Sequence, residues 1–228
     1  MHSARLISIT KPLIPEAQSA HDLIAYCARV SSPQNQDKHS TAARLLRYCL
    51  RKKHFSIFEQ VSLGFEIVTT RDIGRQILRH KSFSFQEFSQ RYAEVPDNPQ
   101  FRECREQDET NRQSSFKTQD EELAYFWQLQ QRRAWSSASG AYWEALSRGI
   151  AKEQARALLP EGLTPSKMYM TGTLRSWVHY ISVRCGVETQ AEHRWIAKDI
   201  AKLLAEQFEF LKDMVAPMQR DDYSAESD

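Results

Sequence analysis

The segment from Arg79 to Tyr92, RHKSFSFQEFSQRY, holds the densest group of side chains that could do chemistry. It places cations, a histidine, a carboxylate and hydroxyls among three phenylalanines. Bulky apolar residues favour burial, so we expect the charges beside them to lie at the wall of a pocket. Cations in a pocket bind anions through charge-assisted hydrogen bonds. The segment therefore predicts a site for an anionic ligand such as a phosphate.

The helix expected just before this segment carries further cations. Arg71, Arg75 and Arg79 are four residues apart and would share one helical face, with Gln76 and His80 on the adjoining stripe. A solvated basic face would give the same pattern in a lone helix. The sequence therefore leaves both a surface role and a binding role open for these arginines.

If residues 87–91 are extended, Glu87, Ser89 and Arg91 project from the same side of the chain. An acid, a hydroxyl and a guanidinium would face one space, where Arg79 and Arg91 could hold a phosphate and Ser89 could add a hydrogen bond.

A nucleophilic role for Ser89 would need a base beside it. His80 is near in sequence, but nothing in the sequence brings it within reach, and no GxSxG motif occurs. A metal site is not expected either, because the 7 histidines are scattered and no HExxH motif is present. Neither a serine hydrolase nor a metalloenzyme is favoured.

Two later segments place cations among apolar residues. Arg156 lies in KEQARALLP, while Arg175, His179 and Arg184 lie in GTLRSWVHYISVR, with the first two sharing a helical face. Arg156 could be a structural ion-pair partner or a pocket anchor. The cations of the second segment could equally be surface residues.

These side chains need a scaffold, and periodicity predicts one of the α/β or α+β class. Alternating or β-branched stretches indicate strands at residues 4–10, 61–70 and 167–173. Helical spacing indicates helices at residues 16–30, 40–53, 70–80, 121–148, 152–159, 174–183 and 190–214. Residues 96–122 are polar and predict a surface excursion, and Ser136–Gly140 could bend the long helix. We expect one domain over residues 1–220 and a frayed acidic tail over 221–228.

Composition excludes several classes of protein. The chain has 228 residues, 41% hydrophobic and 26% charged, with a net charge of +2, so no overall field favours a nucleic-acid or membrane partner. No apolar run could span a bilayer and the first residues lack a signal-peptide core. The 4 cysteines have no CxxC spacing, which favours reduced thiols in a cytoplasmic protein. The 7 glycines form neither GxGxxG nor GxxxxGK[ST].

The segment RHKSFSFQEFSQRY resembles the signature of the flavin-dependent thymidylate synthases (ThyX), RHRxxSxNExSxR. The positions that match this pattern are Arg79, His80, Ser84, Glu87, Ser89 and Arg91. Five further segments occur in the order of that family: ARVSS, HFSIFEQ, GRQILRHK, AKEQARALLP and GTLRSW, followed by Arg184. The resemblance extends over most of the chain.

This resemblance implies a ThyX-like fold, with a mixed or antiparallel sheet flanked by helices. It also implies an enzyme that converts deoxyuridine monophosphate (dUMP) to thymidine monophosphate (dTMP). The family uses FAD reduced by NADPH and takes the carbon unit from 5,10-methylenetetrahydrofolate. Its members are homotetramers with active sites shared between subunits.

Carried over by position, the resemblance also implies the site residues. Arg184 and Ser89 would be catalytic, with Arg184 beside the uracil ring. The dUMP contacts would be Gln76, Ile77, Leu78, Arg79, Glu87, Phe88, Ser89, Gln90, Arg91, Arg156 and Arg184. The FAD contacts would be Ser56, Arg79, His80, Lys81, Glu87, Thr173, Leu174, Arg175 and His179.

Three positions depart from the family pattern. Lys81 replaces an arginine and loses its planar fork, Gln86 replaces an asparagine, and Gln60 stands where many members have histidine. These departures leave flavin affinity and the product open. Two alternatives to dTMP synthesis are a flavin-dependent pyrimidine nucleotide hydroxymethylase of the same fold and a nucleotide-binding regulator without turnover.

Overall fold

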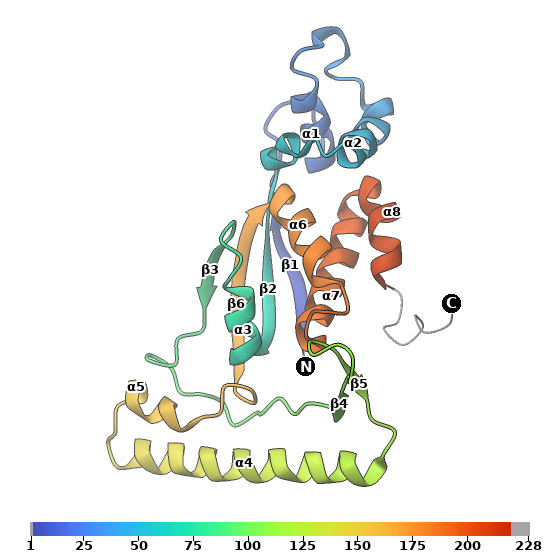
Figure 1. Ribbon diagram of the computed structural model, residues 1–228. Helices are drawn as coiled ribbons and strands as arrows, with labels where there is room; N and C mark the ends of the chain where they lie inside the picture. Colours follow the sequence, from blue (N-terminus) through green and yellow to red (C-terminus); the bar gives the residue numbers. More distant parts are fainter. Residues whose placement is uncertain (1, 220–228) are drawn as a thin grey trace.

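The computed structural model describes residues 2–219 and is built around a four-stranded antiparallel sheet (Figure 1). The strands are β1 (Ser3–Ile9), β2 (Ser62–Thr70), β3 (Ser84–Glu87) and β6 (Pro165–Thr173), in the spatial order β1-β2-β6-β3. Every pairing is antiparallel. The three strands predicted from the sequence are confirmed, and β3 is the strand that the sequence did not reveal.

The helices lie beside one face of this sheet and beyond both of its ends (Figure 1). The α-helices are α1 (Ala20–Ala28), α2 (Ala42–Arg51), α3 (Arg71–Ile77), α4 (Glu121–Ser147), α5 (Lys152–Ala155), α6 (Leu174–Arg184), α7 (Ala191–Gln207) and α8 (Lys212–Val215). The 3₁₀ turns are η1 (Pro33–Asn35), η2 (His39–Thr41), η3 (Phe55–Gln60), η4 (Arg156–Leu158), η5 (Glu209–Leu211) and η6 (Ala216–Gln219). The expected helix over residues 190–214 is wrong in its extent, because α7 ends at Gln207 and Phe208 adopts an extended backbone.

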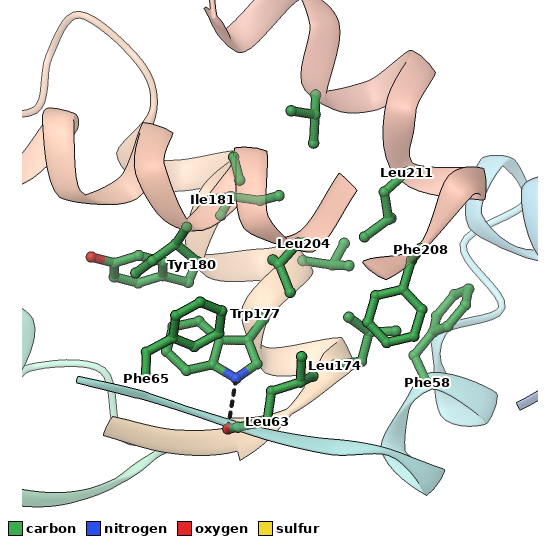
Figure 2. Close-up of a cluster of buried hydrophobic side chains, with 14 of the residues drawn as sticks. Phe58, Leu63, Phe65, Leu174, Trp177, Tyr180, Ile181, Leu204, Phe208 and Leu211 are labelled. Atoms are coloured by element: carbon green, nitrogen blue, oxygen red, sulfur yellow. Dashed lines mark hydrogen bonds between the residues drawn. The ribbon is translucent and has the colours of Figure 1, made fainter. Parts of the chain in front are cut away.

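The main core lies between the sheet and the helices α6 and α7 (Figure 2). Trp177 is fully buried at its centre, with its ring centroid 4.7 Å from that of Phe65 and 4.5 Å from that of Phe83. Its indole Nε1 donates a hydrogen bond of 3.2 Å to the carbonyl oxygen of Leu63. This tryptophan therefore joins α6, β2 and the segment that leads into β3.

The N-terminal helices α1 and α2 belong to the same core, although they stand beyond one end of the sheet in Figure 1. Leu46 and Ile24 are fully buried, and Phe58 of η3 stacks on Phe210 of η5 with 5.4 Å between ring centroids. This stacking joins the N-terminal helical unit to the C-terminal part of the chain.

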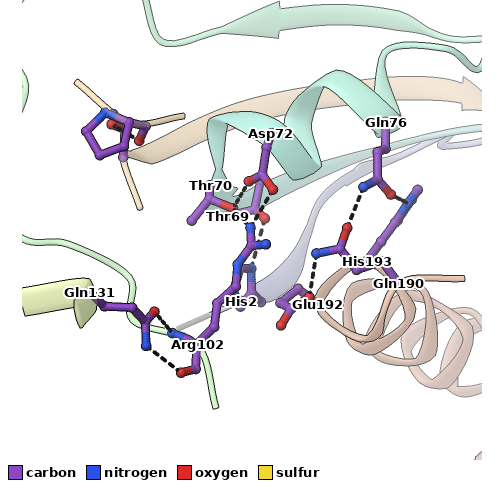
Figure 3. Close-up of polar contacts among 12 residues, drawn as sticks. His2, Thr69, Thr70, Asp72, Gln76, Arg102, Gln131, Gln190, Glu192 and His193 are labelled. Carbon is purple, nitrogen blue, oxygen red and sulfur yellow. Dashed lines mark hydrogen bonds and ion pairs between the residues drawn. The ribbon is translucent and has the colours of Figure 1, made fainter. Parts of the chain in front are cut away.

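Residues 96–122 contain secondary structure that the sequence did not predict. The strands β4 (Arg105–Gln107) and β5 (Ser115–Lys117) form an antiparallel pair within the expected excursion. The hairpin leads into α4, an unbroken helix in which Ser136–Gly140 causes no interruption. Arg102 anchors the segment through an ion pair with Asp72 and backbone contacts to Gln131 (Figure 3).

The helix α4 packs on a second, smaller core of six buried residues. These are Val95, Trp135, Tyr142, Ala155, Leu159 and Leu163. Among residues 2–219, no helix is long and apolar enough to cross a membrane, and no disulfide joins any of the four cysteines. The acidic tail expected at residues 221–228 lies outside the described residues.

Candidate active site

The connection from β2 through α3 to β3 positions the signature segment. Thr70 ends β2 and begins α3, and β3 then pairs with β6 so that Phe85 faces Met170 and Glu87 faces Met168. Gly172 on β6 permits a close approach, because a Cβ atom there would lie only 2.4 Å from the Phe83 ring. The phenylalanines therefore serve as core anchors for the charged residues between them.

Glu87 is held inside the protein by two neighbours. Its Oε1 lies 2.9 Å from Nη1 of the buried Arg71 and accepts a hydrogen bond of 2.9 Å from the hydroxyl of Ser166. Arg71 also donates to the carbonyl oxygen of Phe88 at 3.4 Å. Arg71 is thus a structural partner of the signature segment. Arg75 and Arg79 are exposed, and of these two only Arg79 is a predicted ligand contact.

His80 brings the signature to the end of α6. Its Nε2 accepts a hydrogen bond of 2.9 Å from Nε of Arg184. An arginine Nε–H can only donate, so the His80 ring must be neutral at this nitrogen. Burial, together with the charge of Arg184 and neighbouring His179, lowers the pKa of His80 from 6.5 to about 4. Two residues predicted from separate segments of the sequence are thereby in direct contact.

A chain of hydrogen bonds runs behind this pair and ends on a carboxylate (Figure 3). Glu192 accepts from Gln190 Nε2 at 2.9 Å, and Gln190 Oε1 accepts from Gln76 Nε2 at 2.7 Å. Gln76 Oε1 lies 3.3 Å from Nδ1 of His193, whose Nε2 lies 3.0 Å from the Tyr180 hydroxyl. Burial raises the pKa of Tyr180, so its hydroxyl donates. Every donor and acceptor then has one consistent assignment, which fixes the orientation of the Gln76 amide.

This chain makes stability depend on pH. Burial first, and then Arg184 and His80, lower the pKa of His193 from 6.5 to about 3. Because the unfolded chain binds this proton more readily than the folded one, the stabilising contribution is present above pH 6.5 and is lost as pH falls toward the folded pKa. We expect the urea concentration at the midpoint of denaturation to be lower at pH 5 than at pH 7.

The variant His193→Gln should flatten this pH dependence, since glutamine does not titrate but still donates hydrogen bonds. Urea denaturation across that pH range measures the slope. His54→Gln, at an exposed position, is the matched control and should retain the slope of the parent. Equal slopes in all three proteins would contradict the assignment.

The remaining arginines form a second group, beyond the other end of β3. Arg91 Nε lies 3.7 Å from Oε2 of Glu153, and Arg156 Nε donates to the carbonyl oxygen of Glu153 at 3.3 Å. Within residues 2–219, Arg91 and Arg156 share Glu153 as a partner, whereas Arg184 bonds to His80. These contacts divide the arginines into two groups, Arg91 with Arg156 and Arg184 with His80.

The strand β3 ends at Glu87, and one further backbone bond of 2.8 Å joins the amide of Phe88 to the carbonyl oxygen of Lys167. The chain then turns, and the amides of Tyr92 and Ala93 bond to the carbonyl oxygen of Ser89 at 3.2 and 3.1 Å. The alternating projection that an extended segment would give Glu87, Ser89 and Arg91 is therefore lost.

The turn leaves Ser89 half-buried, and among the described residues no basic side chain contacts it. The neighbouring Gln90 is buried at 6% exposure, and its Nε2 has no hydrogen-bond partner among residues 2–219. A buried amide without an acceptor is costly unless a ligand or solvent satisfies it. Gln90 is consequently a plausible donor to a bound nucleotide, whereas the geometry gives Ser89 no activating base.

Three of the residues predicted to contact FAD, namely Ser56, Arg175 and His179, line two cavities. A cavity of about 530 Å³ is lined by Phe55, Ser82, Arg175, Ser176 and His179, among others. Arg175 forms an ion pair with Glu59 at its wall. Ser56 lines a different cavity, together with Gln60, which departs from the family pattern.

The other predicted residues differ in what they can offer a ligand. Ile77 and Leu174 have fully buried side chains, so only their backbone atoms could reach one. Thr173 caps α6 by accepting from the amide of Ser176. Lys81 is exposed and forms no ion pair among residues 2–219. Gln86 on β3 is also exposed. Leu78 and Phe88 are half-buried.

Four members of the hydrogen-bonded chain were not predicted from the sequence, namely Tyr180, Gln190, Glu192 and His193. His193 is fully buried in α7, where its position on an amphipathic helix suggests only a core residue. A histidine on the apolar face of such a helix is the one signal that could have indicated it. No group of three metal-ligating side chains occurs among residues 2–219.

Known proteins are similar to this chain in fold and in sequence. The solved structure of the UMP/dUMP methylase PolB from Streptomyces cacaoi, bound with 5-Br dUMP, matches with a TM-score of 0.78 and 25% identity over 95% of both chains. A "Flavin-dependent thymidylate synthase" from Synechocystis sp. is 48% identical over 90% of this chain and 94% of its own. A "Probable flavin-dependent thymidylate synthase" from Paramecium bursaria Chlorella virus 1 is 46% identical over 90% and 95%.

The fold and the site therefore define an α+β enzyme of nucleotide metabolism. Residues 12–209 match the family model described as "Thymidylate synthase complementing protein". The chain belongs to this family, that of the flavin-dependent thymidylate synthases. The resemblance seen in the signature segment is confirmed, as are the fold class and the expectation of a flavin-dependent thymidylate synthase instead of a regulator without turnover.

Proposed function

We propose that the chain catalyses the reductive methylation of dUMP to dTMP, with methylenetetrahydrofolate as carbon donor and NADPH as reductant of FAD. The observation that carries the proposal is the contact between Arg184 and His80, because it joins the end of α6 to the signature segment. Arg184 is a predicted dUMP contact and His80 a predicted FAD contact, so this hydrogen bond would connect the two sites.

Arg184 would act on the pyrimidine. Its Nε is occupied by the neutral ring of His80, which orients the guanidinium and leaves both terminal nitrogens for a ligand. A fixed guanidinium beside the uracil stabilises negative charge that develops on the ring as the ring becomes nucleophilic. The hydrogen bonds of Gln76 to Gln190 and His193 hold these three side chains in one arrangement.

The residues present fit a flavin dinucleotide. Arg79, Lys81 and Arg175 supply positive charge for a pyrophosphate, and the cavity beside Arg175 and His179 has apolar wall residues for a ring system. When bound, FAD would supply the hydride that completes the methyl group. Arg79, His80, Lys81 and Arg175 would bind and orient it, and Phe55 would help to exclude water.

We further propose a homotetramer with shared sites. Arg91 and Arg156 lie together but make no contact with Arg184 in one chain, so a second copy that brings its arginine pair to the first would complete the phosphate site. The exposed aromatic residues of α4, including Tyr125, Phe126 and Trp143, favour burial between copies.

An absorbance spectrum followed by product analysis tests this function. The purified protein should be yellow or become yellow with FAD, and dUMP should change the flavin spectrum. Incubation with dUMP, methylenetetrahydrofolate and NADPH should give a product with the mass of dTMP. A hydroxymethylated product would favour the alternative that Lys81 and Gln86 leave open, and a colourless protein that gains no absorbance with FAD would refute both. UMP should be assayed beside dUMP, because PolB is named for both nucleotides.

The variant Arg91→Ala should weaken dUMP binding by about 1.5–3 kcal/mol, since it removes a charge-assisted hydrogen bond to the phosphate. Isothermal titration calorimetry on the FAD-loaded protein measures the change. Glu153→Gln removes the carboxylate that pairs with Arg91 and is the matched control. It should bind dUMP at least as tightly as the parent. Unchanged affinity in Arg91→Ala would place the phosphate elsewhere.

A further inference from the structure

A cavity on the N-terminal helical unit has no role in the function proposed above. It encloses about 580 Å³ beside the end of α1, the loop that follows and the outer side of α2. Four cations line it, namely Arg29, Lys38, Arg44 and Arg51, and no aspartate or glutamate does. In a chain with a net charge of only +2, this is a strong local excess of positive charge.

One of the four cations is fixed by the loop itself. Arg29 donates from Nη1 to the carbonyl oxygen of Lys38 at 2.6 Å and from Nη2 to the hydroxyl of Thr41 at 2.7 Å. Lys38, Arg44 and Arg51 are exposed and form no ion pair with any residue between 2 and 219. Their mutual repulsion is therefore not offset by a carboxylate of the described chain, and a bound anion would relieve it.

Neutral donors complete the lining. Ser32, Asn35, Thr41 and Tyr48 contribute hydroxyl and amide groups to the same cavity. The side chain of Asn35 donates to the hydroxyl of Ser32 at 3.1 Å, so these two groups are already placed. Guanidinium, ammonium and hydroxyl groups around one space are the donors that phosphates and carboxylates accept from.

The cavity shares a wall with the region predicted to contact the flavin. Arg29 and Ser32 face this cavity, whereas Cys27, Val30 and Ser56 line the neighbouring one. Ser56 is one of the predicted flavin contacts. A cosubstrate at the active site would therefore need to extend only past the segment from Cys27 to Ser32 to reach the cations.

We propose that this cavity is an anion-binding site that holds the charged extension of a cosubstrate. Two cosubstrates of the proposed reaction carry one, since polyglutamylated folate ends in several carboxylates and NADPH carries a 2′-phosphate. The cosubstrate assignment rests on the proposed function, but the anion site itself does not.

Calorimetry with inorganic pyrophosphate tests the anion site directly. The double variant Arg44→Gln/Arg51→Gln, in the full chain saturated with FAD and dUMP, should bind pyrophosphate at least tenfold more weakly than the parent. Lys52→Gln is the control, because Lys52 is exposed and adjacent to Arg51 but does not line the cavity. It should bind like the parent. No binding by the parent, or equal binding by all three proteins, would overturn the proposal.

Steady-state kinetics identify the cosubstrate. If the cavity holds a glutamate tail, the double variant raises KM for pentaglutamyl methylenetetrahydrofolate to the value for the monoglutamyl form, with kcat unchanged. If it holds the 2′-phosphate, KM for NADPH rises to that for NADH. No change in either KM would refute the cosubstrate assignment. A parent without turnover would refute the proposed function, and the calorimetry would still decide whether the anion site exists.

Discussion

Arg184→Ala should lower the turnover of dUMP by at least about 100-fold while the protein stays folded. The side chain is half-buried, and its Nε donates to Nε2 of His80, which leaves its two terminal nitrogens for a ligand. Removing one fixed donor that stabilises developing negative charge costs about 10²–10³ in kcat. Because the phosphate contacts belong to other arginines, dUMP binding should be retained.

Single-turnover measurements with reduced enzyme separate the chemical step from substrate binding. Arg184→Lys should recover only part of the loss, since an ammonium keeps the charge but not the planar fork. Arg148→Ala is the matched control, at an exposed helical arginine paired with Glu144, and should turn over normally. An Arg184→Ala enzyme with unchanged kcat, or one whose entire defect is in dUMP affinity, would show that Arg184 does not act on the ring.

Trp177→Ala should lower the free energy of unfolding by about 3–5 kcal/mol, the range typical of removing a buried aromatic side chain. Trp177 is fully buried between Phe65 and Phe83, and its truncation also leaves the Leu63 carbonyl oxygen without its donor. Thermal and urea denaturation of the purified variant measure the loss. A change below about 1 kcal/mol would mean that the site collapses to fill the cavity.

Trp177→Phe is the conservative partner of that variant. It retains most of the ring contacts and loses the hydrogen bond to Leu63, so its destabilisation should be near 1 kcal/mol. Since Phe83 lies between Trp177 and the exposed Lys81, the alanine variant should also weaken FAD binding more than the phenylalanine variant does. Equal FAD affinity in the two would show that the signature segment is held by other contacts.

Most of the scaffold could be predicted because its signals are local. The strand β2 is rich in β-branched and aromatic residues, and α4 has caps and spacing that mark both of its ends. The strand β3 could not be recognised, since its four residues gain their conformation from pairing with β6, about 80 positions later in the chain. The pair β4–β5 was missed because its residues are polar and because short strands carry little periodicity.

The site was predicted in its residues but not in its arrangement. The cations and the signature segment could be identified from their types, whereas the burial of Arg71 and its pairing with Glu87 depend on the tertiary fold. The contact between His80 and Arg184 spans 104 positions, and no spacing rule could reveal it. The turn that follows Phe88 removes the alternating projection of Glu87, Ser89 and Arg91, and its hydrogen bonds to the carbonyl oxygen of Ser89 exist only in the folded chain.

The division of the arginines into two groups also bears on how activity responds to concentration. Arg184 stands with His80, while Arg91 and Arg156 meet at Glu153 beyond the other end of β3. If neighbouring copies must unite these groups, an isolated subunit keeps its fold but lacks half of its phosphate contacts. Specific activity would then decline on dilution. A substitution at the contact between copies could abolish activity without changing any residue that contacts a ligand.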